Sequence, residues 1–445
     1  MGFNVAEGEL VLKGDSMTSF TCPKSVMIGM STSNGTEEPA LTLDGVDASF
    51  SERVHLGSFQ TTSSFSRRPR LVIRNGANVS IGTYIAGRNM EGADFVSSEY
   101  PTTIVENATV NFASLRGSYS WRVHHTLLAT NSTILCNVYE SYGPNSLEVT
   151  GGVMQKNAAG DCFTATMNSS GEGNWQFKGG AKLSLSRFFP AGPFLQYTIG
   201  LKVAFDGATW ETGGGTQPTF HLHGSTNFVF QTTGAGLTLP VAGGKTVNVA
   251  RAITGDGPLV KTGAGSLVFE TQGSWDSTIT TKTALADPVS LAFAGELDVR
   301  EGTVSVESGA CRAGGAYRAA PGASVDFGNN ALGDASFAGA GSFSNFSASG
   351  ATIVSDGVGA DVPSFSSALL SGVTCIDFGR SDELPINWQE VKNVPVARFS
   401  GSVPNVSRWK VSGTGMKNIA GEFSVAEDGV VCVTLVRRGI TIVVF

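Results

Sequence analysis

The stretch that decides the fold runs from Gly257 to Phe269 as GPLVKTGAGSLVF and resumes from Leu297 to Val306 as LDVREGTVSV. Apolar residues recur two positions apart in it, as at Leu267 and Phe269 or at Val304 and Val306. This is the period of a strand with one buried face. Glycines separate the apolar segments, where a tight corner needs a positive φ. One unit of short strand, glycine corner and short strand cannot bury its own apolar face. We therefore expect it to stack on copies of itself.

A looser form of this unit recurs between residues 40 and 210, with two or three apolar residues before an Asn, Asp or Gly corner. The corners fall at residues 44, 75, 107, 131, 151, 179 and 206. Their spacings of 20 to 32 residues favour a parallel β-helix, whose corners accept insertions while its strands do not. A β-sandwich, the main alternative, would show turn signals about every 8–12 residues. We predict an all-β, right-handed parallel β-helix (β-solenoid).

The deciding stretch also resembles a known pattern, the autotransporter-associated β-strand repeat of secreted bacterial passenger regions. The residues that match it are Leu259, Lys261, Thr262, Gly263, Gly265 and Leu267 in the first half and Val299, Gly302, Thr303 and Val304 in the second. Pro258 departs from the pattern, because a second glycine is common there. The match covers residues 253–306. It implies a stalk or adhesin-like β-helix, secreted or displayed on a bacterial surface, within a longer passenger chain.

The last part of the chain differs in composition from the rest. Residues 308–372 are rich in Gly, Ala and Ser but keep the strand alternation, which indicates thin coils with small side chains. From about residue 373 the chain carries more charge and three prolines. An open solenoid end exposes unpaired strand edges, so a cap is expected there. We predict a parallel β-helix over residues 1–372 and a small β-rich C-terminal cap over residues 373–445.

Composition narrows the classes of partner. With 41% hydrophobic residues the chain can fill a core, which argues against wholesale disorder. Its net charge is −7, whereas binders of nucleic acid and of anionic membranes are basic. No apolar run approaches the about 18–20 residues of a membrane-spanning helix. The start of the chain lacks the features of a signal peptide, so we expect a fragment or the loss of an upstream export segment.

Cysteine and histidine patterns predict neither a metal nor a cofactor. The six cysteines show no C-x-x-C spacing. Cys136 and Cys162 are about one coil apart, and could either pair or remain buried thiols. His221 and His223 share a strand face but have no third ligand nearby in the sequence.

The candidate binding surface is an aromatic strip between residues 119 and 142. Its members are Tyr119, Trp121, Arg122, Tyr139 and Tyr142. The tyrosines at 139 and 142 follow the first two aromatics by about one local coil. If they face outward, neighbouring coils present aromatic rings with polar edges, which suit sugar rings. The alternative is a protruding corner that packs its own aromatic side chains against the rod.

A second candidate is the basic cluster of Arg67, Arg68, Arg70 and Arg74, which could hold a sulfate or a uronate. Its alternative is a solvated corner.

Three classes of function remain open. We expect a non-enzymatic β-helix that binds a carbohydrate or a surface protein through its corners and loops. A polysaccharide lyase or hydrolase is the first alternative, but no pair of carboxylates lies at coil spacing on one face, and we predict no catalytic residues. A purely structural fibre segment is the second. Clustered Asp, Glu, Arg or His on one face would favour the enzyme, and an aromatic strip would favour binding.

Overall fold

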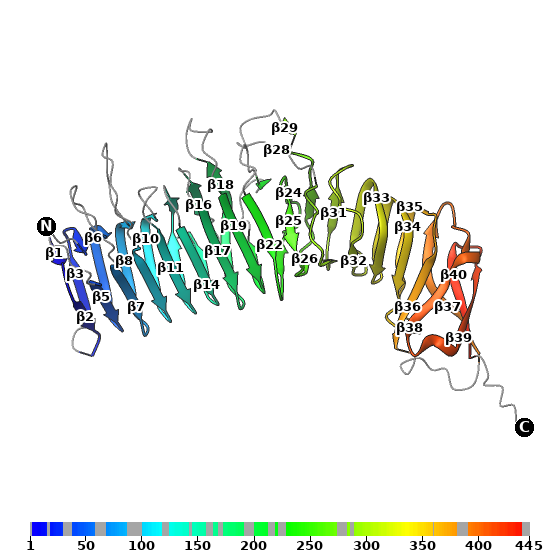
Figure 1. The fold of residues 1–445 in the computed structure, drawn as a ribbon, viewed down its shortest axis with the longest axis horizontal. Helices are drawn as coiled ribbons and strands as arrows, with labels where there is room; N and C mark the ends of the chain where they lie inside the picture. Colours follow the sequence, from blue (N-terminus) through cyan, green and yellow to red (C-terminus); the bar gives the residue numbers. More distant parts are fainter. Residues whose placement is uncertain are drawn as a thin grey trace, which may run out of the picture. The chain divides into compact units, whose positions relative to one another are not determined.

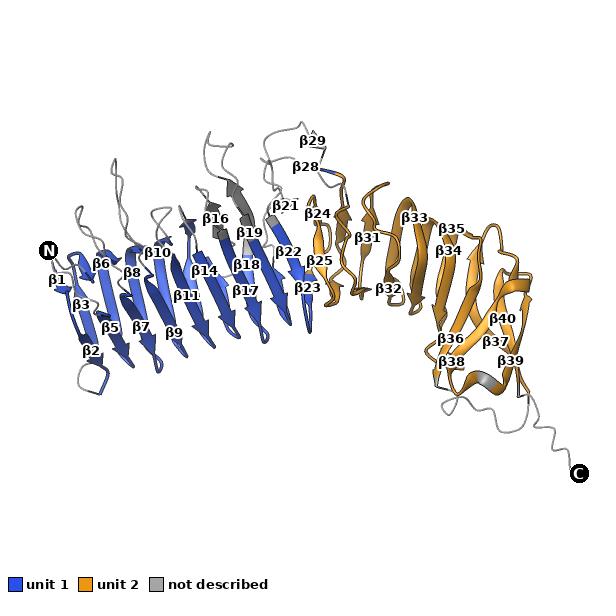
Figure 2. Cartoon of the chain, viewed as in Figure 1, with its two compact units in different colours: residues 1–239, 272–286 blue, residues 240–271, 287–445 orange. Residues whose placement is uncertain are grey.

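The structure is a computed structural model. It describes residues 2–15, 18–29, 38–57, 68–86, 100–117, 124–141, 145–156, 163–167, 172–190, 200–211, 219–220, 228–273, 283–284, 289–358, 360–380 and 390–437. These residues form strands and two 3₁₀ turns, η2 (Val406–Arg408) and η3 (Met416–Asn418), with no α-helix among them. The predicted all-β parallel β-helix is confirmed. The chain divides into two compact units (Figure 2), unit 1 with residues 1–239 and 272–286, and unit 2 with residues 240–271 and 287–445.

Unit 1 contains a parallel sheet to which each coil contributes one strand (Figure 1). Each strand pairs with the next one in the chain of this sheet, for example Leu71 of one strand with Thr103 of the next. In order, the strands of this sheet that belong to unit 1 are β2 (Glu9–Lys13), β5 (Ala40–Asp44), β7 (Arg70–Arg74), β9 (Thr102–Glu106), β11 (His125–Thr130), β14 (Asn145–Thr150), β17 (Glu172–Lys178), β19 (Gly200–Asp206) and β22 (Phe228–Thr232). We call this sheet the unit 1 sheet.

A second series of strands completes the coils of unit 1. It consists of β1 (Phe3–Val5), β3 (Ser19–Cys22), β4 (Val26–Ile28), β6 (Asp47–Leu56), β8 (Asn78–Ala86), β10 (Thr109–Arg116), β12 (Thr133–Cys136), β13 (Val138–Ser141), β15 (Val153–Gln155), β16 (Phe163–Met167), β18 (Lys182–Pro190), β20 (Ala208–Glu211), β21 (Thr219–Phe220) and β23 (Leu237–Pro240). The first half of β10 pairs with β12 and its end pairs with β13. The chain therefore bends within this series. A short antiparallel pair, β28 (Gln272–Gly273) and β29 (Thr283–Ala284), accompanies the unit.

Corners with a left-handed backbone end the strands of the unit 1 sheet. The residues with positive φ there are Gly45, Asn75, Asn107, Asn131, Gly151, Gly179 and Gly207. Asparagine takes this conformation more readily than other residues with a side chain, and glycine takes it without strain. The corner amides bond to the next coil, as from Asn75 N to Glu106 O at 3.2 Å. The predicted corners at 75, 107, 131, 151 and 179 are confirmed, and those at 44 and 206 lie one residue before the left-handed glycine.

Unit 2 repeats the parallel pairing with strands of more varied length. These are β24 (Thr246–Val249), β25 (Ile253–Gly255), β26 (Leu259–Thr262), β27 (Ser266–Phe269), β30 (Glu296–Val299), β31 (Thr303–Val306), β32 (Ala316–Ala319), β33 (Ser324–Ala338), β34 (Ser342–Val354), β35 (Ser364–Leu370) and β36 (Thr374–Arg380). They range from the short β25 to the long β33 and β34. In the stretch that decides the fold, β26 pairs with β30 and β27 with β31. The six apolar positions of these strands that define the period, from Leu267 to Val306, are at most 2% exposed. The predicted strand alternation is confirmed there.

Lys261 occupies an inward position of unit 2, in a strand whose neighbouring inward residue, Leu259, is apolar and fully buried. It is fully buried, and its Nζ donates hydrogen bonds to Gly263 O and, at 2.7 Å, to Glu301 O. Burial lowers its pKa to about 8. An unpaired charge in this row would cost several kcal/mol, on the order of the penalty for an uncompensated buried ion. Lys261 is tolerated at this position because the carbonyls of two glycine corners accept its hydrogen bonds.

The C-terminal region combines both directions of pairing. Its strands are β37 (Val391–Ser400), β38 (Lys410–Thr414), β39 (Ile419–Val425) and β40 (Val430–Arg437). Parallel stacking continues across the predicted boundary at 372/373, because β36 pairs with β34 and β38 pairs with β36. Antiparallel pairing begins only where β40 joins β37 and β39. The described antiparallel part is thus smaller than the predicted cap.

Candidate functional site

The predicted aromatic strip is mostly outside the described residues, and its one described member does not face outward. Tyr119, Trp121, Arg122 and Tyr142 are outside them. Tyr139 is fully buried, and its ring meets Trp175 edge-on at 5.0 Å between centroids. The prediction that Tyr139 is an exposed binding residue is wrong. Between the buried Cys136 and Tyr139 stand two residues that do not point inward, and this extra step reverses the alternation on which the prediction relied.

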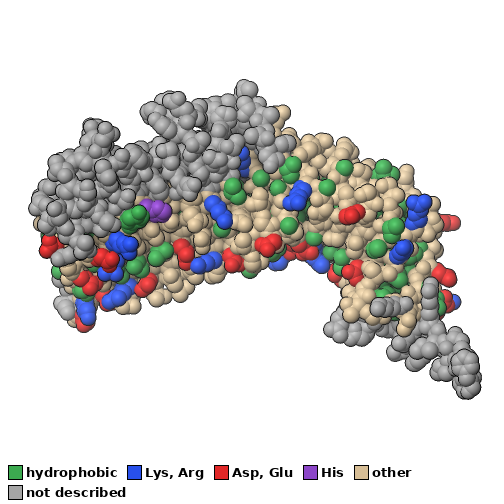
Figure 3. All heavy atoms as spheres, in the orientation of Figure 1, with side chains coloured by type: hydrophobic (Ala, Val, Ile, Leu, Met, Phe, Trp, Pro, Cys, Tyr) green, Lys and Arg blue, Asp and Glu red, His purple; other side chains and the backbone are tan. Residues whose placement is uncertain are grey.

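Outward-facing side chains gather instead on neighbouring strands of the unit 1 sheet, near the beginnings of β7, β9, β11 and β14. We call these residues the outer patch. They are Arg68, Arg70, Tyr100, Thr102, His124, Thr126 and Ser146. Register aligns four of them across the sheet, since Arg70 pairs with Thr102, Thr102 with Thr126 and Thr126 with Ser146. Figure 3 shows basic, hydrophobic and histidine side chains together over this part of unit 1.

Buried prolines set the position of the outer patch. Pro69 and Pro101 immediately precede β7 and β9 and are buried. Their carbonyls accept hydrogen bonds from the next coil, from Thr102 N at 2.9 Å and from Thr126 N at 3.0 Å. Because side chains alternate along a strand, the residues on both sides of each proline point outward. Arg68 and Tyr100 are therefore brought to the same face as Arg70 and Thr102.

The centre of the outer patch is a stacked aromatic pair. The Tyr100 and His124 rings lie 6.2 Å apart between centroids with an interplanar angle of 29°. Tyr100 is 43% exposed, and His124 Nε2 is hydrogen-bonded to Ser146 Oγ at 3.0 Å. Burial lowers the pKa of His124, so its ring is uncharged at neutral pH. The result is a supported flat surface with a hydroxyl group at its edge.

Two arginines border this aromatic pair. Arg68 and Arg70 are exposed, and the Nη2 of Arg70 is 4.0 Å from Glu38 Oε2, a long pair between two half-exposed side chains. Such pairs contribute little and leave the cation accessible. Arg74 differs, because its Nε and Nη2 both bond Asp44 Oδ2, at 3.1 and 3.0 Å. Of the predicted basic cluster, Arg67 is outside the described residues.

An apolar row runs beside the outer patch. Val72, Ile104 and Leu128 are in register across β7, β9 and β11. Leu128 is 36% exposed, and the other two are half-buried. Flat aromatic and apolar surface beside hydroxyl and guanidinium groups can pack the C–H faces of a sugar and hydrogen-bond its oxygens.

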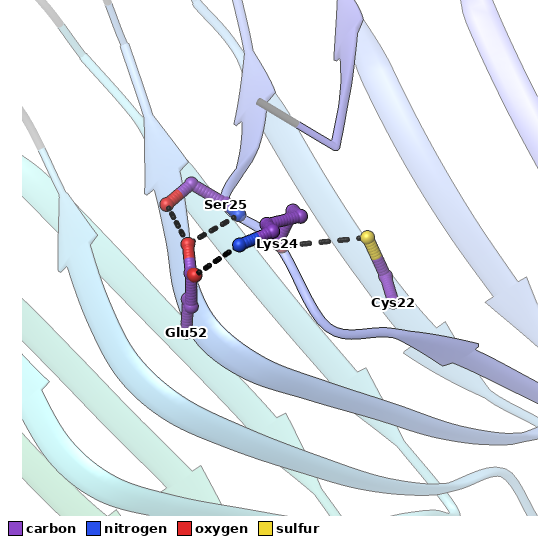
Figure 4. Close-up of polar contacts among 4 residues, drawn as sticks. All are labelled: Cys22, Lys24, Ser25 and Glu52. Carbon is purple, nitrogen blue, oxygen red and sulfur yellow. Dashed lines mark hydrogen bonds and ion pairs between the residues drawn. The ribbon is translucent and has the colours of Figure 1, made fainter.

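Two described carboxylates of the second strand series of unit 1, Glu52 and Glu140, are engaged in structural contacts. Figure 4 shows Glu52 accepting hydrogen bonds from Ser25 N and Ser25 Oγ, both at 3.1 Å, and from Lys24 Nζ at 3.4 Å. The hydrogen bond from the Ser25 side chain is the largest cause of the lowered pKa of Glu52. Glu140 is paired with Arg116 at 2.9 Å. Low-pKa or paired carboxylates are poor general acids.

Metal-binding groups and reactive thiols would be the other candidate sites in the described part of the chain. There, no group of three His, Cys, Asp or Glu residues could hold a metal ion. The described cysteines include Cys136, which is a buried free thiol with a pKa raised by burial. Cys162, its predicted partner, and the His221/His223 pair are outside the described residues. Within the same described part, no helix has the length and apolar character of a membrane span.

Unit 2 has an open groove of about 590 Å³ on one side of its coils. Gly and Ala residues of the composition-biased region make it hollow, and Asp334, Ser336 and Thr352 supply its polar groups. It follows from the predicted thin coils, but it has no aromatic side chain. The outer patch is the better-equipped surface for a ligand.

Comparison of the chain with protein-family models, with curated proteins and with solved structures finds no match.

Sequence reasoning overlooked Tyr100, Thr102, Thr126 and Ser146. A signal for two of them was present, because the X-Pro-X triplets centred on Pro69 and Pro101 begin successive strands. Aligning the chain on these prolines would have placed Arg68 beside Tyr100.

Proposed function

We propose that this protein is a non-enzymatic β-helix that binds carbohydrate through the outer patch. The observation that carries the proposal is the stacking of the exposed Tyr100 ring on the half-buried His124 ring, with the Ser146 hydroxyl beside them. Stacking of a sugar face on an aromatic ring, with hydrogen bonds at the rim, needs this combination of groups. A rigid sheet holds them at the spacing of stacked strands, about 4.8 Å.

The proposed setting is a secreted or surface-displayed bacterial passenger of the autotransporter-associated repeat type. Its support is the repeat pattern of residues 253–306 together with the buried role of Lys261, which gives the pattern's lysine a structural reason. In this setting the β-helix is the scaffold and the outer patch is the adhesive surface.

The test is affinity electrophoresis and product analysis on a panel of neutral and acidic polysaccharides. We expect retarded migration in at least one polymer gel, without new reducing ends or unsaturated uronides. Tyr100→Ala should weaken the retardation about tenfold, since loss of an aromatic stacking surface costs on the order of 1–2 kcal/mol. Leu369→Ala is the matched control, because Leu369 is an exposed apolar residue of unit 2, 64% accessible.

Each other outcome would overturn the proposal. Cleavage of a polymer would identify a polysaccharide lyase or hydrolase. Absence of retardation on every polymer would favour a structural fibre segment. Retardation that is lost in Trp121→Ala and Tyr142→Ala but kept in Tyr100→Ala would move the binding surface to the strip predicted from the sequence.

A further inference from the structure

We infer that the ligand of the outer patch is an acidic polysaccharide, whose carboxylate or sulfate groups bind Arg68 and Arg70 while a sugar ring stacks on Tyr100. This inference rests on the proposed function and specifies its substrate class.

The first step is the placement of the two guanidinium groups. Arg70 is in register with Thr102 of the next coil, and Arg68 and Tyr100 are each two residues earlier. Two cations on one coil thus border the aromatic and hydroxyl groups of the next, about 4.8 Å further along the stack. A polymer that lies along the stack meets a charged position and a stacking position in succession.

The second step is the charge balance of these arginines compared with others in the protein. Arg74 bonds Asp44 at 3.0 Å and Arg116 bonds Glu140 at 2.9 Å. In unit 2, Arg318 contacts Glu296 at 3.5 Å. In contrast, among the described residues Arg70 has only the 4.0 Å contact with Glu38 and Arg68 has no ion pair. Although the net charge of the chain is −7, the described residues of the outer patch include two arginines and no carboxylate.

The third step is the chemistry of the neighbouring groups. The next strands contribute Thr102, Thr126 and Ser146 on the same row. Neutral hydroxyl groups do not repel an anion, whereas carboxylates there would. Guanidinium groups bind carboxylate and sulfate oxygens through paired N–H donors. The outer patch therefore favours an anionic sugar over a neutral one.

The experiment compares polymers that share a backbone and differ in charge. The probes are polygalacturonate against its methyl-esterified form, and dextran sulfate against dextran, measured by titration with the full chain. We expect each acidic polymer to bind about tenfold or more tightly than its neutral counterpart, since hydrogen bonds to charged groups are stronger than those between neutral groups. Added salt should weaken the acidic polymers only.

The variant is Arg68→Gln/Arg70→Gln, and the control is Lys182→Gln/Lys202→Gln, which removes the same charge from exposed positions of unit 1 outside the outer patch. We expect the arginine variant to remove the preference for the acidic polymer and the lysine variant to keep it. Equal binding of charged and neutral polymers, unchanged in the arginine variant, would overturn the inference while leaving carbohydrate binding intact. No binding of any polymer would overturn the proposed function itself.

Discussion

Among the described residues of unit 1, some buried polar groups have hydrogen-bond partners and others do not. The Tyr84 hydroxyl contacts Thr103 Oγ1 and lies 3.3 Å from His125 Nε2, which is 3.1 Å from the same threonine oxygen. All three side chains are fully buried. The Tyr139 hydroxyl is equally buried but has no hydrogen-bond partner in the described part of the protein. Neighbouring tyrosines thus have opposite energetic roles.

Phenylalanine substitutions should separate these roles. Tyr84→Phe removes a bonded hydroxyl and leaves Thr103 and His125 with fewer partners, so we expect a loss of about 1–2 kcal/mol in the free energy of unfolding. Tyr139→Phe removes a buried hydroxyl that gains nothing, so we expect a change between neutral and about 1 kcal/mol of added stability. Urea unfolding followed by far-UV circular dichroism measures both. Equal destabilisation by the two substitutions would contradict this account.

Whether a side chain points into the core could be predicted from the sequence only where the alternation of inward and outward residues is uninterrupted. Leu267 and Phe269 follow a strict period of two and are buried as predicted. Tyr139 follows an irregular step, which the sequence does not mark, and its direction was predicted wrongly. Lys261 has the period of an inward residue, but its charge predicts exposure. The sequence does not show that the carbonyls of Gly263 and Glu301 accept its hydrogen bonds.

The corner is the element that fixes where one strand ends and the next coil begins. Gly263, in the corner after β26, has φ +77°, and a Cβ there would collide with the backbone oxygen of Val241. Gly244, between β23 and β24, has φ +72°, but a Cβ there would meet nothing within 4 Å. The two glycines share a left-handed backbone and differ only in the space around them.

Alanine at these two corners should therefore have graded effects. Gly244→Ala carries only the left-handed strain, about 1–2 kcal/mol. Gly263→Ala adds a backbone clash of about 1–3 kcal/mol, comparable with overpacking a core. We expect the urea midpoint of the unit 2 transition to fall in both variants and to fall further in Gly263→Ala. A larger loss in Gly244→Ala would show that the collision is relieved at no cost.

Corner chemistry explains why elements were more predictable than sites. Asn and Gly mark a left-handed backbone wherever they end an apolar run, so the corners at Asn75, Asn107 and Asn131 could be placed from the sequence. The outer patch depends on which residues from different coils are in register. Coil length varies from 20 to 32 residues, so Tyr100 and His124 could be paired only after the register was known.

At the scale of the whole molecule, stability should depend on pH through buried histidines of unit 1. Burial lowers the pKa of His125 from 6.5 to about 3 and, with Arg53 adding to it, that of His55 from 6.5 to about 4. Below pH 6.5 these histidines bind protons in the unfolded chain but stay neutral in the folded protein. The free energy of unfolding therefore falls as pH falls from 6.5 towards 4. Each unit of pKa difference corresponds to about 1.4 kcal/mol.

Urea unfolding at pH 7.5, 6, 5 and 4 should reveal this slope. His125→Gln removes the largest contribution, so the variant should be less stable at pH 7.5 but lose less stability on acidification than the unsubstituted protein. His124→Gln, at a half-buried position of the outer patch, should change the slope less, because the lowered pKa of His124 reflects weaker burial. If His125→Gln keeps the full acid slope, then acid destabilisation comes from carboxylates such as Asp44, whose pKa is lowered chiefly by the Asn75 hydrogen bond. The loss from such a carboxylate begins only near the pKa of the unfolded chain, about 3.9 for Asp, whereas the histidine loss begins near pH 6.5, so the pH at which the loss begins distinguishes the two sources.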